Sequence, residues 1–253
     1  MSNYKTVFFT LGILLIILGI AMIVPLAFQL IYKELDSTFV VSGIITITFG
    51  VLFFLSNIDH LKSINTQQAF LLTALSWLSI AVFGSLPFFF SELNLSITDS
   101  FFESMSGITT TGATILSNIE NSPKGILIWR AMLQWLGGIG VILMAITLMP
   151  IMNIGGMQLL KISSYDTSEK ILPKSKQISL RLIMVYLFLT LFCAIFYKIF
   201  GMNFFDSITH SMTTIATGGF SNYDQSIGYF NNPYIEIISI LFTAFINTSI
   251  PFL

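Results

Sequence analysis

Two polar stretches in a strongly apolar chain contain the residue types that bind a dehydrated cation. They are "ITTTGATILSN", with Thr109, Thr110, Thr111 and Gly112, and "TTIATGGFSN", with Ala216, Thr217, Gly218 and Gly219. Glycine permits the left-handed backbone angles that turn successive carbonyl groups to one side. Stacked carbonyls, with threonine hydroxyls nearby, replace the water shell of an alkali cation. The two stretches therefore predict a cation-binding site.

A short segment precedes each stretch, and the two segments match without gaps over ten residues. They read "SITDSFFESM" from Ser96 and "NFFDSITHSM" from Asn203. Continued without a gap, the alignment pairs Gly112 with Gly219, whereas a single gap pairs Gly112 with Gly218. The sequence leaves both registers open. A phosphate-binding loop is disfavoured, because neither copy has P-loop spacing and no lysine follows the glycines.

The matched segments are predicted to be short, capped helices. Ser96 or Asn203 can accept a backbone N–H bond at the helix start, and an aspartate three residues later suits the positive end of the helix dipole. A helix from there to about Ile108 or Thr214 is about 18 Å long and cannot cross a bilayer. We therefore expect two re-entrant helices, whose following loops are buried in protein or line water.

The composition indicates an integral membrane protein. Of 253 residues, 55% are hydrophobic and 9% are charged. Four long intervals of the chain carry no charge, since 27, 22, 29 and 30 residues separate Lys5 from Lys33, Asp36 from Asp59, Lys62 from Glu92 and Arg130 from Lys161. A helix needs roughly 20 apolar residues to span the hydrocarbon. With two shorter intervals after Arg181 and Ile237, we predict six membrane helices.

The predicted organisation is all-α, with a hairpin followed by a repeated unit. Residues 1–62 form the transmembrane hairpin, 63–160 the first unit, 161–177 a cytoplasmic loop and 178–253 the second unit, which ends within its last span. Each unit consists of a span, a short re-entrant helix, a polar loop and a second span. This is the minimal pore unit of a cation channel.

The charges predict that the N-terminus is cytoplasmic. In that orientation the inner side carries seven basic residues and the outer side four, while nine of the twelve acidic residues lie outside. The positive-inside rule favours this arrangement. The basic loop from Lys161 to Arg181 would contact anionic lipids. An acidic outer mouth would attract cations, although ordinary solvated loops explain the same pattern.

Three long stretches resemble the TrkH branch of the Trk/Ktr/HKT potassium-transporter superfamily. They are "FFESMSGITTTGATILSNIE", "WLGGIGVILMAITLMPIMNIGGMQL" and "TIATGGFSNYDQSIGYF". The resemblance implies four units in a pseudo-fourfold pore, with Thr109 to Gly112 and Ala216 to Gly219 as two of its selectivity-filter strands. It also implies K⁺ as the transported ion, because Gly112 occupies the position at which, in this superfamily, a serine is linked with a preference for sodium. It further implies a bacterial inner-membrane homodimer with a cytoplasmic TrkA-type nucleotide-binding regulatory subunit, and no nucleic-acid partner.

Members of this family are about twice as long as this chain, so two of the four units are missing here. Two strands cannot enclose an ion, because a carbonyl ring needs donors on all sides. We therefore expect an incomplete half of a potassium-uptake pore. The alternative is a non-conducting membrane subunit or fragment that associates with a complete transporter.

Other conspicuous residues have modest interpretations. Arg130 is expected to snorkel or to pair with a loop acid, and His210 to be a core histidine without a nearby acid. Pro25 and Pro87 are expected to end or kink helices. The glycines of "WLGGIG" are expected to allow close helix packing, with gating flexibility as the alternative. The single cysteine, Cys193, is expected to be a packing residue, and no nucleophile, metal cluster or covalent cofactor motif supports an enzyme.

Overall fold

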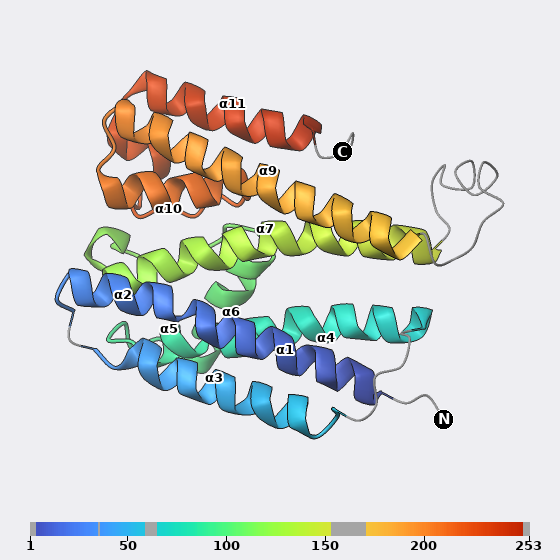
Figure 1. Cartoon of the computed structure of the whole chain (residues 1–253). Helices are drawn as coiled ribbons and strands as arrows, with labels where there is room; N and C mark the ends of the chain where they lie inside the picture. The colour runs from blue at the N-terminus through green and yellow to red at the C-terminus, as the bar shows by residue number, and fades with distance from the viewer. Residues whose placement is uncertain (1–3, 35, 59–64, 153–170, 250–253) are drawn as a thin grey trace.

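The first three helices form an antiparallel hairpin at one side of the molecule. The computed structural model describes residues 4–34, 36–58, 65–152 and 171–249, and its long helices lie side by side in a bundle (Figure 1). In the hairpin, α1 is Lys5–Ala21, α2 is Ile23–Ile31 and α3 is Thr38–Leu55. The break at Met22 comes three residues before Pro25, whose ring removes a backbone donor and clashes with the preceding turn. The expected kink at Pro25 is confirmed.

The first unit follows the predicted order of a span, a short helix, a loop and a span. Its elements are α4, Thr66–Gly84; α5, Leu86–Phe90; α6, Ile97–Ile108; the 3₁₀ turn η1, Ile119–Asn121; and α7, Lys124–Met152. Asn65 and Gln68 cap α4 reciprocally, each side chain bonding the other residue's backbone N–H. The interruption at Ser85, two residues before Pro87, confirms the second expected proline break.

The second unit repeats this order. It consists of α9, Ile171–Ile199; α10, Phe204–Ile215; the turn η3, Ser226–Phe230; and α11, Pro233–Ser249. The short helices α6 and α10 stop inside the bundle, while α7 and α9 run along most of its length (Figure 1). The two re-entrant helices predicted from the paired segments are therefore present, with ends within one residue of those expected.

Five segments of the described chain are long and apolar enough to cross a membrane. They are Lys5–Ile31, Thr38–Leu55, Thr66–Phe90, Lys124–Met144 and Ile178–Ile199. The sixth expected span, α11, has 17 residues, fewer than the roughly 20 that a crossing needs. The described helix α9 also begins at Ile171, seven residues before the expected start of its span, although its apolar part starts at Ile178 as predicted. Residues 161–170 of the basic loop lie outside the described part, as do residues 153–160 before it. Residues 171–177, expected in the cytoplasmic loop, are helical and belong to α9.

Helix α7 lies at the centre of the fold. It lies between the hairpin side of the bundle and the second unit (Figure 1), and it packs against α6, α10 and α2. Trp129, which is fully buried, donates its indole N–H to the carbonyl of Gly84 at 2.9 Å and so attaches α7 to the end of α4. The Glu34 carboxylate accepts the backbone N–H groups of Lys124 and Gly125, at 2.6 and 3.1 Å, which suits the positive N-terminus of α7.

The hairpin depends on the missing side chain of Gly12, because α1 and α3 touch through their backbones there. A Cβ at Gly12 would stand 2.6 Å from the backbone nitrogen of Phe54 and 2.7 Å from the carbonyl oxygen of Gly50. We predict that Gly12→Ala lowers the free energy of unfolding by about 1–3 kcal/mol, because backbone atoms must move apart. Thermal unfolding of the detergent-solubilised chain measures this change.

Gly140→Ala is the matched control, since a Cβ on this helical glycine would have no atom within 4 Å of it. Alanine favours a helix over glycine by up to about 1 kcal/mol, so this variant should be neutral or slightly more stable. Equal loss of stability in the two variants would contradict the backbone contact between α1 and α3.

Candidate ion-binding site

Both short helices end in the same backbone motif, from which the two polar loops begin. We define loop 1 as residues 109–115 and loop 2 as residues 216–222. At the end of α6, Thr111 N–H bonds the carbonyl of Ser106 at 3.0 Å and Thr110 N–H bonds that of Gly107 at 2.9 Å. These are the two bonds of a Schellman motif, with Thr110 at its left-handed position. Gly218 and Thr217 make the equivalent bonds to Thr213 and Thr214 at the end of α10, both at 3.0 Å.

The backbone angles decide the register that the sequence left open. Thr110 and Thr217 have φ of +56° and +53°, and Gly112 and Gly219 have φ of +78° and +80°. In both pairs, Thr110 with Thr217 and Gly112 with Gly219, the two residues are 107 positions apart. The structure therefore agrees with the ungapped alignment, which pairs Gly112 with Gly219. A threonine with positive φ costs about 1–3 kcal/mol and is held only where the surrounding structure requires it. The two loops therefore have the same backbone conformation, with the same unfavourable φ at equivalent threonines.

The hydrogen bonds of the two loops leave a set of carbonyl groups free. The N–H groups of Thr109, Thr110 and Thr111 are bonded back to their helix, as are those of Ala216, Thr217 and Gly218. In the described part of the chain, no hydrogen bond is accepted by the eight carbonyls of residues 109–112 and 216–219. These carbonyl oxygens are free to accept, while the N–H groups beside them are already hydrogen-bonded. Such a row of oxygens suits a cation and disfavours an anion.

The two loops approach each other at their glycines. A Cβ on Gly112 would overlap the carbonyl oxygen of Gly218. Glycine is therefore required at position 112 both by its positive φ and by this approach. All eight residues expected to bind the ion thus lie in two equivalent loops that meet at Gly112 and Gly218.

Helix α7 supports both loops through adjacent glycines. A Cβ on Gly137 would overlap the carbonyl of Ile108 at the end of α6, and one on Gly138 would lie 3.2 Å from Cα of Ala216 at the end of α10. The glycines of "WLGGIG" therefore allow close packing of a span against both re-entrant helices, as predicted. Gly140 does not take part, since nothing lies within 4 Å of its Cβ position.

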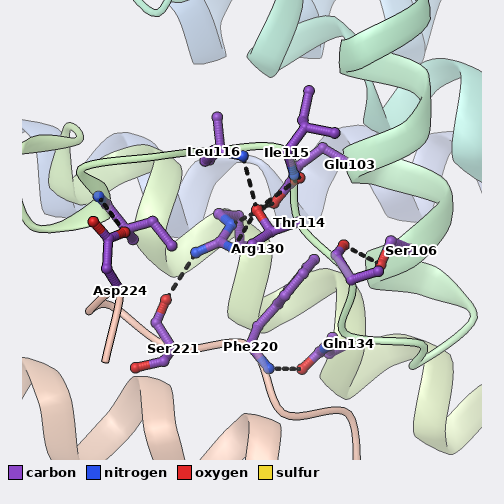
Figure 2. Close-up of polar contacts among 12 residues, drawn as sticks. Glu103, Ser106, Thr114, Ile115, Leu116, Arg130, Gln134, Phe220, Ser221 and Asp224 are labelled. Atoms are coloured by element: carbon purple, nitrogen blue, oxygen red, sulfur yellow. Dashed lines mark hydrogen bonds and ion pairs between the residues drawn. The ribbon is translucent and has the colours of Figure 1, made fainter. Parts of the chain in front are cut away.

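A buried ion pair lies behind loop 1. Nε of Arg130 on α7 donates to Oε1 of Glu103 on α6 at 2.8 Å, and both side chains are almost completely inaccessible. Glu103 also accepts the Thr114 hydroxyl at 2.9 Å and the Ile115 N–H at 3.2 Å. Figure 2 shows these groups converging on the carboxylate. Helix α6 thereby holds the second half of loop 1 through a charged group whose hydrogen bonds are all within the protein.

Arg130 also reaches loop 2. Its Nη1 donates to the carbonyl of Ser221 at 2.8 Å, its Nη2 donates to the Thr114 hydroxyl at 3.1 Å, and its guanidinium lies 4.2 Å from the ring centroid of Phe220 (Figure 2). The expectation that Arg130 snorkels or pairs with a loop acid is wrong, because its partner is on the re-entrant helix. Isolated charges in a membrane segment usually face the protein interior with a partner, and this rule was the available signal for Arg130. Glu103 was not singled out from the sequence.

The second unit has the same contact with different chemistry. His210 occupies the position equivalent to Glu103, and its Nε2 lies 2.9 Å from the hydroxyl of Ser221, the equivalent of Thr114. Its Nδ1 lies 3.0 Å from the carbonyl of Asp206. His210 is thus a satisfied core histidine as expected, but an acid, Asp206, does lie one turn earlier.

Asp206 anchors the end of loop 2 and the segment after it to the start of α10. Its carboxylate accepts bonds from Asn222 and from the Tyr223 hydroxyl, both at 2.7 Å. Burial, followed by the hydrogen bond to Asp206, raises the pKa of Tyr223 further above neutral pH, where a tyrosine phenol is already protonated and can donate. Asp224 then accepts the N–H groups of Asn118 and Ile119, at 2.9 and 3.1 Å, and so connects the segments that follow the two loops.

The fold and the paired loops define a multi-pass membrane protein built from units of span, re-entrant helix, loop and span. Comparison with known proteins then identifies the family. Residues 35–253 match the family model of TrkH, described as a cation transport protein. The chain belongs to this family.

Three relatives show how far the similarity extends. The Trk system potassium uptake protein TrkH of Halomonas elongata is 40% identical over 236 residues, 92% of this chain and 49% of that protein. TrkH of Escherichia coli K12 is 38% identical over 95% of this chain and 50% of its own length. The crystal structure of the potassium transporter TrkH from Vibrio parahaemolyticus superposes with a TM-score of 0.83 at 35% identity, over 95% of this chain and 49% of that one. The chain therefore spans about half the length of these relatives.

We predict that Glu103→Gln and Arg130→Met each destabilise the fold strongly. Removing one member of a buried ion pair leaves the other group buried without its counter-charge, which costs about 3–5 kcal/mol. The double variant should lose less than the sum of the two single losses, because it leaves no unpaired charge. Thermal unfolding in detergent measures the three changes.

Glu92→Gln is the matched control, because Glu92 is exposed. Surface changes of this kind usually alter the free energy of unfolding by no more than about 0.5 kcal/mol. If the single variants at Glu103 and Arg130 unfold at the temperature of the parent protein, the pair does not hold the loops.

Proposed function

We propose that this chain supplies two of the four filter strands of a potassium-uptake pore in the bacterial inner membrane. The observation that carries the proposal is the set of eight carbonyls, at residues 109–112 and 216–219, that accept no hydrogen bond in the described chain. Inside a bilayer such groups are costly unless they line water or bind an ion. Carbonyl rings of this kind coordinate dehydrated K⁺.

The geometry of Gly112 supports potassium as the ion. Its positive φ and its approach to the Gly218 carbonyl leave no room for a side chain. A serine there would shift the loop backbone and add a hydroxyl, which would change the ring that replaces the ion's water. The names of the relatives, potassium uptake proteins of Trk systems, agree with this choice.

The remaining strands, the orientation and the partners are part of the same proposal. A complete ring needs two further loops, supplied by a continuation of the chain or by another chain. The excess of basic residues on one side supports a cytoplasmic N-terminus. By analogy with the family, we propose a homodimer whose basic segment of residues 161–181, including the start of α9, lies near a TrkA-type nucleotide-binding regulatory subunit and anionic lipids.

We predict that a complete transporter, made by continuing this chain with the C-terminal half of the Escherichia coli relative, restores growth of cells lacking potassium uptake at low external K⁺. Gly112→Ser in the same transporter should lower the K⁺ over Na⁺ uptake ratio by about tenfold, or about 1.4 kcal/mol of discrimination. Growth at graded K⁺ and Na⁺ and tracer flux measure these outcomes.

Gly201→Ser is the matched control. Gly201 also has a positive φ, +112°, but no atom lies within 4 Å of its Cβ position, so it tests backbone strain without crowding at the loops. It should leave selectivity unchanged. A complete transporter that reaches the membrane but carries no K⁺ would favour the alternative, a non-conducting subunit.

A further inference from the structure

The carboxamide of Gln134 lies between the two loops and is bonded on one side only. Gln134 is on α7, and its side chain is fully buried. Its Oε1 accepts the backbone N–H of Phe220, the residue directly after Gly219, at 3.1 Å (Figure 2). Its Nε2 is buried and has no hydrogen-bond partner among the described residues. A buried donor without a partner usually costs about 1–3 kcal/mol, so its retention calls for an explanation.

The position of this carboxamide explains why residue 218 is a glycine, which its backbone angles do not explain. Gly218 is not among the residues with positive φ, yet a Cβ there would stand only 2.5 Å from Oε1 and 2.7 Å from Nε2 of Gln134. A Cβ on Gly112 would stand 3.6 Å from the same Nε2 and would overlap the carbonyl of Gly218. Gln134 therefore packs directly on loop 2 and faces loop 1 with its unbonded N–H group.

We propose that Gln134 is a positioning residue for the ion pathway, which fixes the separation of the two loop backbones and thereby the preference for K⁺ over Na⁺. This inference rests on the proposed function. Gln134 is shielded from solvent and packs against the backbone of the loops, so it acts through Gly112, Gly218 and Phe220. Its bonded oxygen holds loop 2, and its bulk stops Gly218 from moving toward α7.

A positioning role differs from simple packing in its effect. Cation discrimination depends on the spacing and field of the coordinating oxygens, and a small shift of one strand changes both. A residue that only fills space would alter yield and stability and leave the ratio of transported ions unchanged. The ratio of K⁺ to Na⁺ uptake is therefore the informative readout.

The test uses the complete transporter described above. Gln134→Met keeps the length of the side chain and removes both polar groups. It should lower the K⁺ over Na⁺ uptake ratio by about tenfold, or about 1.4 kcal/mol, while the protein remains folded and in the membrane. Leu133→Met, at the neighbouring buried position on α7, is the control for a conservative core change and should leave the ratio as in the parent.

A second pair of variants keeps the inference testable if Gln134→Met folds poorly. Gly218→Ala should lower membrane yield, because its Cβ meets the Gln134 carboxamide, and combining it with Gln134→Ala should restore yield without restoring selectivity. Unchanged selectivity in Gln134→Met, or no rescue in the double variant, overturns the inference while leaving the proposed function intact. Absence of K⁺ transport in the parent transporter would instead count against the proposed function.

Discussion

The structure depends on keeping two irregular pieces of backbone inside a helical membrane bundle. Peptide groups at membrane depth must be bonded or must face water or an ion. Loops 1 and 2 meet this constraint in the same way. The N–H groups of residues 109–111 and 216–218 bond back to the preceding helix, and in the described chain the carbonyls of residues 109–112 and 216–219 accept no hydrogen bond. The capped starts of α6 and α10, the left-handed threonines and the glycines that follow all serve this arrangement.

Helix α7 connects the two loops. Its first half presents Arg130 and Gln134 to the chain just after Gly219, and its glycines Gly137 and Gly138 let the ends of α6 and α10 come close. Loop 2 is therefore held in part by the first unit. The two units repeat in backbone geometry and differ in the groups behind their loops, with the Glu103–Arg130 pair in one and His210 with Ser221 in the other.

Much of the fold could be predicted because membrane spans and capped helix starts are local signals. Long uncharged intervals located the spans, and Ser96 with Asp99 and Asn203 with Asp206 located the starts of the short helices. The two polar stretches were predicted from their residue types and from the repeat, whereas the choice of residues 109–112 and 216–219 within them came from the resemblance to the family. The register of Gly219 could not be predicted, because it depends on backbone angles that two neighbouring glycines leave open. The partner of Arg130 and the roles of Glu103 and Gln134 could not be predicted either, because they depend on contacts between residues 27 to 91 positions apart. A single apolar sequence does not specify which faces of its helices meet.

The most direct test of the account is to locate the ion itself. Crystals of the complete transporter grown in Rb⁺, a congener of K⁺ with usable anomalous scattering, would place the cation relative to the loops. The account predicts anomalous density within coordination distance of the carbonyls of residues 109–112 and 216–219, from both loops together. Density elsewhere along the bundle, or carbonyls bonded to protein donors with no ion between the loops, would contradict it.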